Sequence, residues 1–253
     1  MSAGPMLREW RRRRRLSQLD LALEAGVSAR HLSFVETGRA RPSADMVVHL
    51  AEQLEIPLRE RNRLLIAAGH APVYEQHTLE DPEMAPVRDT IQRVLDAHEP
   101  CPALVIDRHW EMLAANASLG VLLEGVAPEL LEPPVNVLRV GLHPAGMAPR
   151  IVNYAEWRGH LVERLHRQIS LTGDPQLRGL LDELEGYSGP DTSDPGPADE
   201  IAVPLKLRGA DGAVLTFIST VATFGTAVEV TASELSIETF FPADAETAAR
   251  LSS

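Results

Sequence analysis

The spacing of four small and apolar residues near the start of the chain constrains its fold more than any other feature. Ala22, Gly26, Leu32 and Val35 follow the pattern Ala-x3-Gly-x5-Leu-x2-Val. Where two short helices cross, the crossing needs a small residue, the turn favours glycine, and apolar residues seat the second helix. The spacing therefore predicts two helices joined by a tight turn, the second over residues 28–36. The space beneath this helix is expected to be filled by Leu19, Leu23 and Val27.

Residues 1–70 as a whole are predicted to form an all-α bundle of five helices. The first helix carries Leu7 and Trp10, and its other faces carry arginine. The remaining four patterns cover residues 17–25, 28–36, 43–54 and 58–68. Three of them start at a serine, which caps a helix by accepting a hydrogen bond from a backbone N–H group. A linker is predicted to follow over residues 71–84, which lack periodicity and contain two prolines.

Charge is divided unevenly along the chain. The net charge of the whole chain is −12. Residues 1–70 hold 12 arginines, no lysine and 8 acidic residues, a net charge of +4, so residues 71–253 carry a net charge of −16. Such asymmetry is typical of a nucleic-acid-binding segment joined to another domain. Because the acidic part repels DNA, contact is expected at the basic end alone.

The residues that flank the helix pair extend its pattern. Ser17-Gln18 precedes the pair, and Glu36-x-Gly38-x-x-Arg41-Pro42-Ser43 follows it. With these flanks, residues 7–69 resemble the lambda-repressor-like helix-turn-helix of the Xre family. The resemblance implies a sequence-specific DNA-binding transcription regulator, a homodimer that places each third helix in a major groove of a two-fold symmetric, double-stranded DNA operator.

The resemblance also implies roles for individual residues. Gln18, at a helix N-terminus, is expected to touch a backbone phosphate. The groove-facing positions of the third helix are Ser28, Ala29, Arg30 and Ser33. His31 is included among the candidate DNA-contacting residues, but its role is left open. Arg30 can pair with guanine, with a phosphate contact as the alternative, and Ala29 can meet a thymine methyl group. Arg39 and Arg41 are expected to position the protein on phosphates. Glu36 is expected to hold the loop backbone, with base reading as the alternative. The arginine run at residues 11–15 is expected to form a solvated face, which can contribute one or two phosphate contacts.

Residues 85–253 are expected to form one α+β domain. Helical patterns are predicted at residues 87–98, 116–125, 151–171 and 175–184. A hairpin is predicted over residues 103–114, and a Pro-, Gly- and Asp-rich loop over residues 187–199. After the loop, apolar residues alternate from Ile201 to Leu207, and two β-rich stretches follow at residues 214–224 and 228–241. Together these strands predict one antiparallel sheet of about five strands.

Several segments of this domain resemble a known sensor family. Residues 103–116, a strand, turn, strand and helix start, are similar to the opening of a PAS-type sensor. The segments at residues 133–139, 150–157 and 238–244 resemble the MmyB-like regulators, in which a PAS-like ligand-binding domain follows an Xre-type domain. The resemblance implies a small, largely apolar effector, with a fatty acid as the natural candidate.

A candidate ligand site follows from helical spacing. The residues that recur at this spacing are Arg150, Asn153, Trp157, His160 and Arg164. On one helix face, a cation, an amide and an aromatic ring can hold a carboxylate head group at the mouth of an apolar cavity. Asn116 is added to this site, with capping of a helix as its alternative role. Trp157 can instead belong to the core, and the two arginines can pair with nearby acids.

No catalytic motif is present. The chain lacks a glycine-rich phosphate loop, a His-Glu-x-x-His pair and a Gly-x-Ser-x-Gly turn. Its nine histidines are scattered, and Cys101 is the single cysteine, so neither a metal site nor an intrachain disulfide is expected. We therefore expect a protein that is not an enzyme and holds no cofactor. Without an apolar run of membrane length or a signal-peptide pattern, a cytoplasmic location and no membrane partner are expected.

Two functions for residues 85–253 remain open. The domain can sense an apolar ligand, or it can serve only dimerisation or the binding of a protein partner. A deep, dry cavity favours the first function, and a filled core with an exposed apolar patch favours the second.

Overall fold

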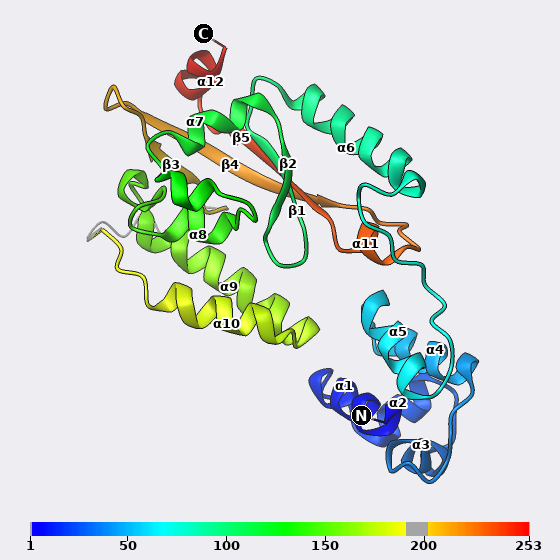
Figure 1. Ribbon diagram of the computed structural model, residues 1–253. Helices are drawn as coiled ribbons and strands as arrows, with labels where there is room; N and C mark the ends of the chain where they lie inside the picture. Colours follow the sequence, from blue (N-terminus) through cyan, green and yellow to red (C-terminus); the bar gives the residue numbers. More distant parts are fainter. Residues whose placement is uncertain (1, 191–201, 253) are drawn as a thin grey trace. The chain divides into compact units, whose positions relative to one another are not determined.

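A computed structural model describes residues 2–190 and 202–252, which fall into two compact units (Figure 1). The N-terminal unit contains residues 2–78 together with two short later segments, Ser170–Thr172 and Thr226–Ser233. The C-terminal unit contains Leu79–Ile169, Gly173–Gly225 and residues 234–252. Each unit has a hydrophobic core of its own.

The N-terminal unit begins with the predicted helices. They are α1 (Ala3–Arg13), α2 (Gln18–Glu24), α3 (Ala29–Glu36), α4 (Ala44–Gln53) and α5 (Leu58–Ala67). Ser17, Ser28 and Ser43 cap α2, α3 and α4, each accepting from the backbone N–H three residues later. Asp20 accepts in turn from the Ser17 N–H at 2.8 Å, which completes a capping box. Local chemistry therefore sets where these helices begin.

The core of this unit uses a different face of α2 from the one predicted. Leu21, Ala22 and Ala25 are buried, whereas Leu19 and Leu23 are 59% and 72% exposed. The expectation that the last two leucines lie beneath the helix pair is wrong. Because residues three and four apart share a helix face, burying Leu21 and Ala25 turns Leu19 and Leu23 outward.

The chain after α5 is fastened to that helix. The amide oxygen of Asn62 accepts from the backbone N–H groups of Val73 and Tyr74 at 3.0 and 3.1 Å. The amide nitrogen of Asn62 donates to the Tyr74 carbonyl at 2.7 Å. One side chain of α5 thus satisfies three backbone groups of the segment that the sequence marks as a linker.

The late segment Thr226–Ser233 is bonded to the same linker. A carboxylate oxygen of Glu229 accepts from the His77 N–H at 2.8 Å, and the Val230 N–H donates to the Glu75 carbonyl at 2.9 Å. The Thr231 hydroxyl donates to the His77 carbonyl at 2.5 Å. We call residues 75–77 and 229–231 the linker clasp. The sequence predicted a strand from residue 228, but Val230–Ser233 forms the short helix α11.

The C-terminal unit is built on one antiparallel sheet of five strands, in the order β2-β1-β5-β4-β3. Its strands are β1 (Ala103–Ile106), β2 (Met112–Ala115), β3 (Leu205–Arg208), β4 (Val214–Thr223) and β5 (Ser236–Pro242). The last strand, β5, lies between β1 and β4, with Ile237 opposite Val105 and Thr239 opposite Thr220. The α+β fold with an antiparallel sheet of about five strands is confirmed.

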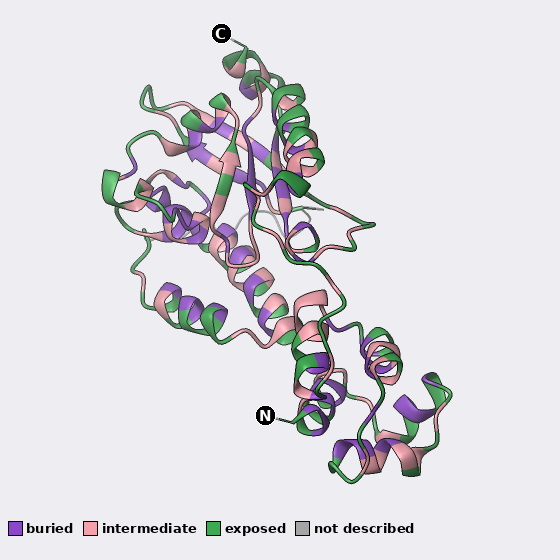
Figure 2. Ribbon diagram, turned by 45° about the vertical axis from the view of Figure 1, so that its right-hand side comes forward, coloured by how far each residue is buried: buried purple, intermediate pink, exposed green. Residues whose placement is uncertain are grey.

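Helices cover the two faces of this sheet, and Figure 2 shows buried residues along its strands. The helix α6 (Ala85–His98) packs on one face, where Ile91 and Leu95 meet Ala103 and Val105. The opposite face belongs to the larger core, which includes Leu104 and side chains of α8 (Val137–Leu142), α9 (Tyr154–Thr172) and α10 (Pro175–Glu185). Because side chains alternate along a strand, neighbouring residues of β1 serve different cores.

The structure departs from the predicted elements at several places. The helix α9 starts at Tyr154 and not at residue 151, since Ala148–Arg150 is a 3₁₀ turn and Ile151 pairs with Leu207. The helix predicted over residues 116–125 is a 3₁₀ turn (Ala117–Leu119) followed by the short α7 (Gly120–Leu123). The final helix α12 (Ala245–Leu251) was not predicted. Ile201 and most of the predicted loop at residues 187–199 lie outside the described residues.

The remaining short elements are 3₁₀ turns at Pro82–Met84 and Pro128–Leu131. Among the described residues, no helix is both long and apolar enough to cross a membrane.

Candidate functional site

The turn between α2 and α3 has the geometry that the sequence predicts. Gly26 has a φ of +63°, in the left-handed region that favours glycine. The next residue, Val27, donates its N–H to the Ala22 carbonyl at 2.9 Å, which closes the end of α2. The two helices of the helix-turn-helix are therefore joined by a glycine-dependent turn.

The helix α3 buries one face and leaves polar side chains on the other. Leu32 and Val35 are each 1% exposed. Arg30 is exposed, and its guanidinium lies 5.4 Å from the centre of the Phe34 ring. Of the other predicted groove-facing residues, Ser28 is exposed and the half-buried ones are Ala29, His31 and Ser33. An arginine placed on an aromatic ring at an exposed helix face keeps its donors free for a nucleic-acid base or phosphate.

Gln18 and Glu36 belong to a network that joins α1, α2 and α3. The Gln18 amide nitrogen donates to a Glu36 carboxylate oxygen at 2.7 Å. The same carboxylate receives two hydrogen bonds from Arg11, at 2.7 and 2.9 Å. Burial raises the pKa of Glu36, but the hydrogen bonds from Arg11 and Gln18 lower it, and the net pKa lies below the ordinary value. Glu36 thus fixes the helices through side chains and does not hold the loop backbone as expected.

Arginines of this unit divide into structural and exposed ones. Arg11 is buried, and Arg14 donates to the carbonyls of Leu54 and Glu55, so the predicted solvated run is solvated only in part. Arg41 donates to the Ala68 and Gly69 carbonyls at 2.8 and 3.1 Å, at the end of α5. Arg39, by contrast, is exposed at the end of the helix-turn-helix.

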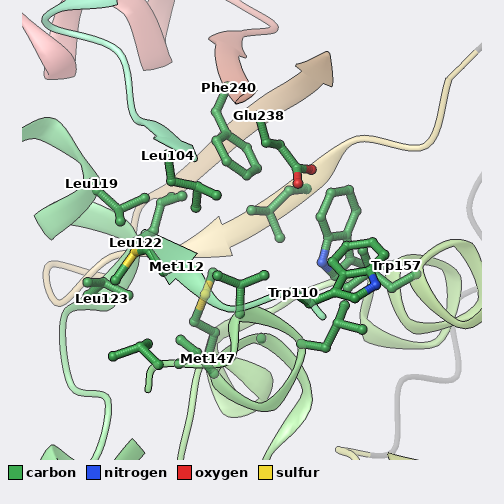
Figure 3. Close-up of a pocket in the computed structure, with 17 residues that line it drawn as sticks. Leu104, Trp110, Met112, Leu119, Leu122, Leu123, Met147, Trp157, Glu238 and Phe240 are labelled. Atoms are coloured by element: carbon green, nitrogen blue, oxygen red, sulfur yellow. The ribbon is translucent and has the colours of Figure 1, made fainter. Parts of the chain in front are cut away.

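A second candidate site is an apolar cavity of about 60 Å³ inside the C-terminal unit (Figure 3). Its wall combines side chains of β1, β2, α7, α8, α9 and β5. Leucines and valines form most of the wall, with the larger side chains contributed by Trp110, Met112, Met147, Trp157 and Phe240. Water finds few partners in such a cavity, so an apolar molecule is favoured there.

One carboxylate faces this cavity. Glu238 on β5 is 5% exposed and is the one ionisable residue among the described residues that line the wall. Its two oxygens each lie 3.3 Å from Nη1 of Arg164 on α9. The Arg164 guanidinium also stacks on Trp110, 4.4 Å from the ring centre. The cavity therefore has an apolar wall with one carboxylate, Glu238, whose partner Arg164 is not among the lining residues.

The structure brings only part of the predicted ligand site to the cavity. Trp157 lines it, and His160 lies beside Trp157 with ring centres 5.8 Å apart. Burial and, second, the nearby Arg164 charge lower the pKa of His160, which favours the neutral ring. Arg164, which was predicted on the same helix face, contacts Glu238.

Arg150, Asn153 and Asn116 are absent from the residues that line the cavity. The prediction that Arg150 and Asn153 continue the helical stripe is wrong, because α9 begins after both. Arg150 donates to the backbone carbonyls of residues 121, 122, 124 and 208. Asn153 bonds to Pro204 and Lys206, and Asn116 bonds to Ala103 and Cys101. All three side chains hold backbone together.

Glu238, the polar residue that faces the cavity, was not predicted. A glutamate in a strand usually faces solvent, so its type gave no signal. Its position in the strand did give a signal. Glu238 and Phe240 are two residues apart, so they share a face of β5, and Phe240 is an apolar residue expected to face the core. Among the described residues, no group of three or more histidine, cysteine or acidic side chains is placed to hold a metal ion.

Comparison with protein families matches both parts of the chain. Residues 87–253 match the model described as MmyB-like transcription regulator ligand binding domain. Residues 7–61 match a helix-turn-helix model. No curated protein matches the chain.

Proposed function

This chain belongs to the MmyB-like transcription regulators, and on that premise we propose that a small, largely apolar ligand in the cavity of Figure 3 controls how the protein binds its operator. The protein is a DNA-binding transcription regulator with a ligand-binding domain. We further propose that it acts as a homodimer and presents Arg30 and its neighbours on α3 to the major groove.

The observation that carries the proposal is the cavity wall. A filled core would serve dimerisation alone, whereas this core leaves a space bounded almost entirely by apolar and aromatic side chains. At about 60 Å³ the space is smaller than most pockets for drug-sized ligands. Met112 and Met147 lie in its wall, and unbranched methionine side chains adapt readily to a guest. A fatty acid, the candidate implied by the family resemblance, enters only if these side chains move.

A route from the cavity to the DNA-binding helices is offered by the chain itself. Glu238 on β5 faces the cavity, and only a few residues before it the chain forms the linker clasp. The clasp holds residues 75–77, and Asn62 of α5 holds the residues just before them. A ligand that shifts β5 therefore acts on a segment bonded to the linker. Such coupling requires that the ligand bind one arrangement of the clasp more tightly than the other.

The ligand part of the proposal is tested by native mass spectrometry of the purified full-length protein, followed by denaturing extraction of bound small molecules. A co-purifying apolar compound supports it and identifies the ligand class. The same spectra report whether the protein is a homodimer. A protein free of bound compound, with no thermal shift against a panel of fatty acids, fatty alcohols and aromatic compounds, favours the alternative in which this domain only dimerises or binds a protein partner.

The control of DNA binding is tested separately. Operator sequences are selected from a random DNA library, and fluorescence anisotropy then measures the Kd for the selected DNA with and without the extracted compound. We expect the compound to change the Kd at least fivefold, within the usual range of allosteric coupling of about 1–3 kcal/mol. Equal Kd values in both conditions contradict control by the ligand and leave DNA binding itself intact.

A further inference from the structure

The polar end of the cavity has the wrong sign for an acidic ligand. Among the described residues that line the cavity, the one ionisable side chain is that of Glu238, and 6% of it is exposed. Figure 3 shows this carboxylate pointing into the space beside Trp110 and Trp157. Its partner Arg164 contacts both oxygens at 3.3 Å and stacks on the Trp110 ring.

A carboxylate ligand would disturb this pair. It would meet Glu238 at close range, and two carboxylates with one guanidinium leave a negative charge without compensation in a site of low dielectric constant. Drawing Arg164 away from Glu238 would have the same result, because it leaves Glu238 buried and unpaired. The other cation predicted for an acidic head group, Arg150, is engaged by four backbone carbonyls and does not line the cavity.

A hydroxyl group fits the same end without disturbing it. An ionised carboxylate offers about four acceptor positions, and Arg164 approaches the two oxygens of Glu238 through a single nitrogen. Acceptor positions are therefore left for a donor that comes from the cavity. A neutral O–H donor adds a hydrogen bond and no charge.

We propose that the cavity selects compact apolar molecules that carry a hydroxyl group at one end, and that Glu238 is the residue that selects them over the corresponding carboxylic acids. This inference rests on the proposed function, because it assumes that the cavity binds a ligand. It makes Glu238 a specificity-determining residue and the alcohol its preferred ligand class.

The test compares matched ligands on the full-length protein at neutral pH, with isothermal titration calorimetry as the measurement. The probes are 1-hexanol, hexanoate and hexyl methyl ether, which share one chain and differ in the head group, and the same comparison is repeated at ten carbons. We expect the alcohol to bind at least tenfold more tightly than the ether, which lacks the donor, and than the acid, which is ionised. Hydrogen bonds to charged groups have strengths consistent with this ratio.

Two variants locate the effect. In Glu238→Gln the anionic acceptor is lost and Arg164 loses its counter-charge, so the preference for alcohol over acid is expected to fall at least tenfold. Glu234→Gln is the matched control, because Glu234 pairs with Arg108 and does not line the cavity. Its ligand preference should equal that of the unchanged protein. The comparison of ligands on the unchanged protein stands even if Glu238→Gln does not fold.

The outcomes distinguish a failure of this inference from a failure of the proposed ligand-binding function. If hexanoate or decanoate binds as tightly as the matching alcohol, the head-group inference is overturned and the ligand-binding cavity remains. If the Glu238→Gln variant still prefers the alcohol over the acid by the same factor as the unchanged protein, Glu238 is not the residue that selects the ligand. If no probe of either chain length binds, the head-group inference falls, and the proposed function is decided separately by whether a compound co-purifies with the protein.

Discussion

Arg11 and Glu36 form a two-point ion pair across 25 residues of sequence, with Nε 2.7 Å from one carboxylate oxygen and Nη2 2.9 Å from the other. Both side chains are nearly inaccessible, at 9% and 1% exposed. The pair ties the C-terminal part of α1 to the end of α3, and so fixes the helix that faces DNA in the proposed function. Salt and solvent screen a buried pair far less than a surface pair.

Replacing Glu36 with glutamine should destabilise the protein substantially. The change leaves the buried Arg11 charge without a counter-charge and should lower the free energy of unfolding by about 3 kcal/mol. This value is the lower end of the range for breaking such pairs, because glutamine keeps one hydrogen-bond acceptor. Urea unfolding followed by circular dichroism measures the difference. Glu9→Gln is the control, because Glu9 pairs with Arg13 at the surface and should cost less than about 1 kcal/mol. Equal losses in the two variants would contradict the structural role of Glu36.

The same pair predicts how stability depends on pH. The pKa of Glu36 in the folded protein lies below its ordinary value, so the unfolded chain takes up its proton first as the pH falls. The stabilisation is therefore complete above the unfolded pKa, about 4.3, and is lost as the pH falls through the folded pKa. Urea unfolding across this range should show the stability gap between Glu36→Gln and the unchanged protein narrowing below pH about 4. A gap that stays constant into strong acid is the contrary result.

Arg30→Ala should weaken operator binding at one base position by about 1–3 kcal/mol. Arg39→Ala should instead weaken binding to all sequences evenly and reduce the salt dependence by the equivalent of about one phosphate contact. Anisotropy titrations against single-base variants of a selected operator, at several salt concentrations, distinguish the two. Arg63→Ala is the control, since Arg63 is exposed on a different helix, α5, where it pairs with Glu60. A base preference that survives Arg30→Ala would remove Arg30 from the residues that determine sequence.

The two faces of α2 should respond differently to shortening. Leu21→Ala removes a side chain that is fully buried, and should cost about 2–5 kcal/mol. Leu23→Ala removes one that is 72% exposed, and should change stability by less than about 0.5 kcal/mol. Urea unfolding of both variants under one set of conditions tests the assignment of the buried face. Comparable losses of unfolding free energy in the two variants would show that Leu23 belongs to the core, as the sequence pattern predicted.

Loosening the linker clasp should separate ligand binding from its effect on DNA. Glu229→Gln weakens the acceptor for the N–H groups of His77 and Ala232. Affinity for the extracted ligand, and for DNA without ligand, should be unchanged, while the ligand-induced change in Kd for DNA falls several-fold. Glu80→Gln is the control, because Glu80 is exposed and lies outside the clasp. A full ligand response in Glu229→Gln would exclude the clasp as the route.

The sequence predicted elements well where local chemistry decides them. Serine caps set the starts of the first helices, and a glycine sets the turn between two of them. The alternation of apolar and polar residues predicted the strands. It failed where tertiary contacts decide. Nothing local distinguishes Leu21 from Leu23 on a helix of seven residues, and only the assembled core of the unit, which contains Leu21, selects the buried one.

The candidate site was predicted in outline and missed in its chemistry. Trp157 lines the cavity, and its contact with a ligand stays a prediction. Arg150 and Asn153 were included because the predicted helical spacing starts too early. The pairing of Glu238 with Arg164 was not predicted, because the two residues are 74 positions apart in the sequence. Pairings over such distances arise only once the sheet and α9 are assembled.

The linker clasp also gives the protein an order of events during its synthesis. The core of the first five helices is complete once residue 68 has left the ribosome. The clasp, however, joins His77 to Glu229, which is made 152 residues later, about 8–30 s at usual rates of elongation. Throughout that interval Asn62 can hold residues 73 and 74, but residues 75–77 lack the bonds that Glu229 and Thr231 make later. Only a nearly finished polypeptide completes the clasp.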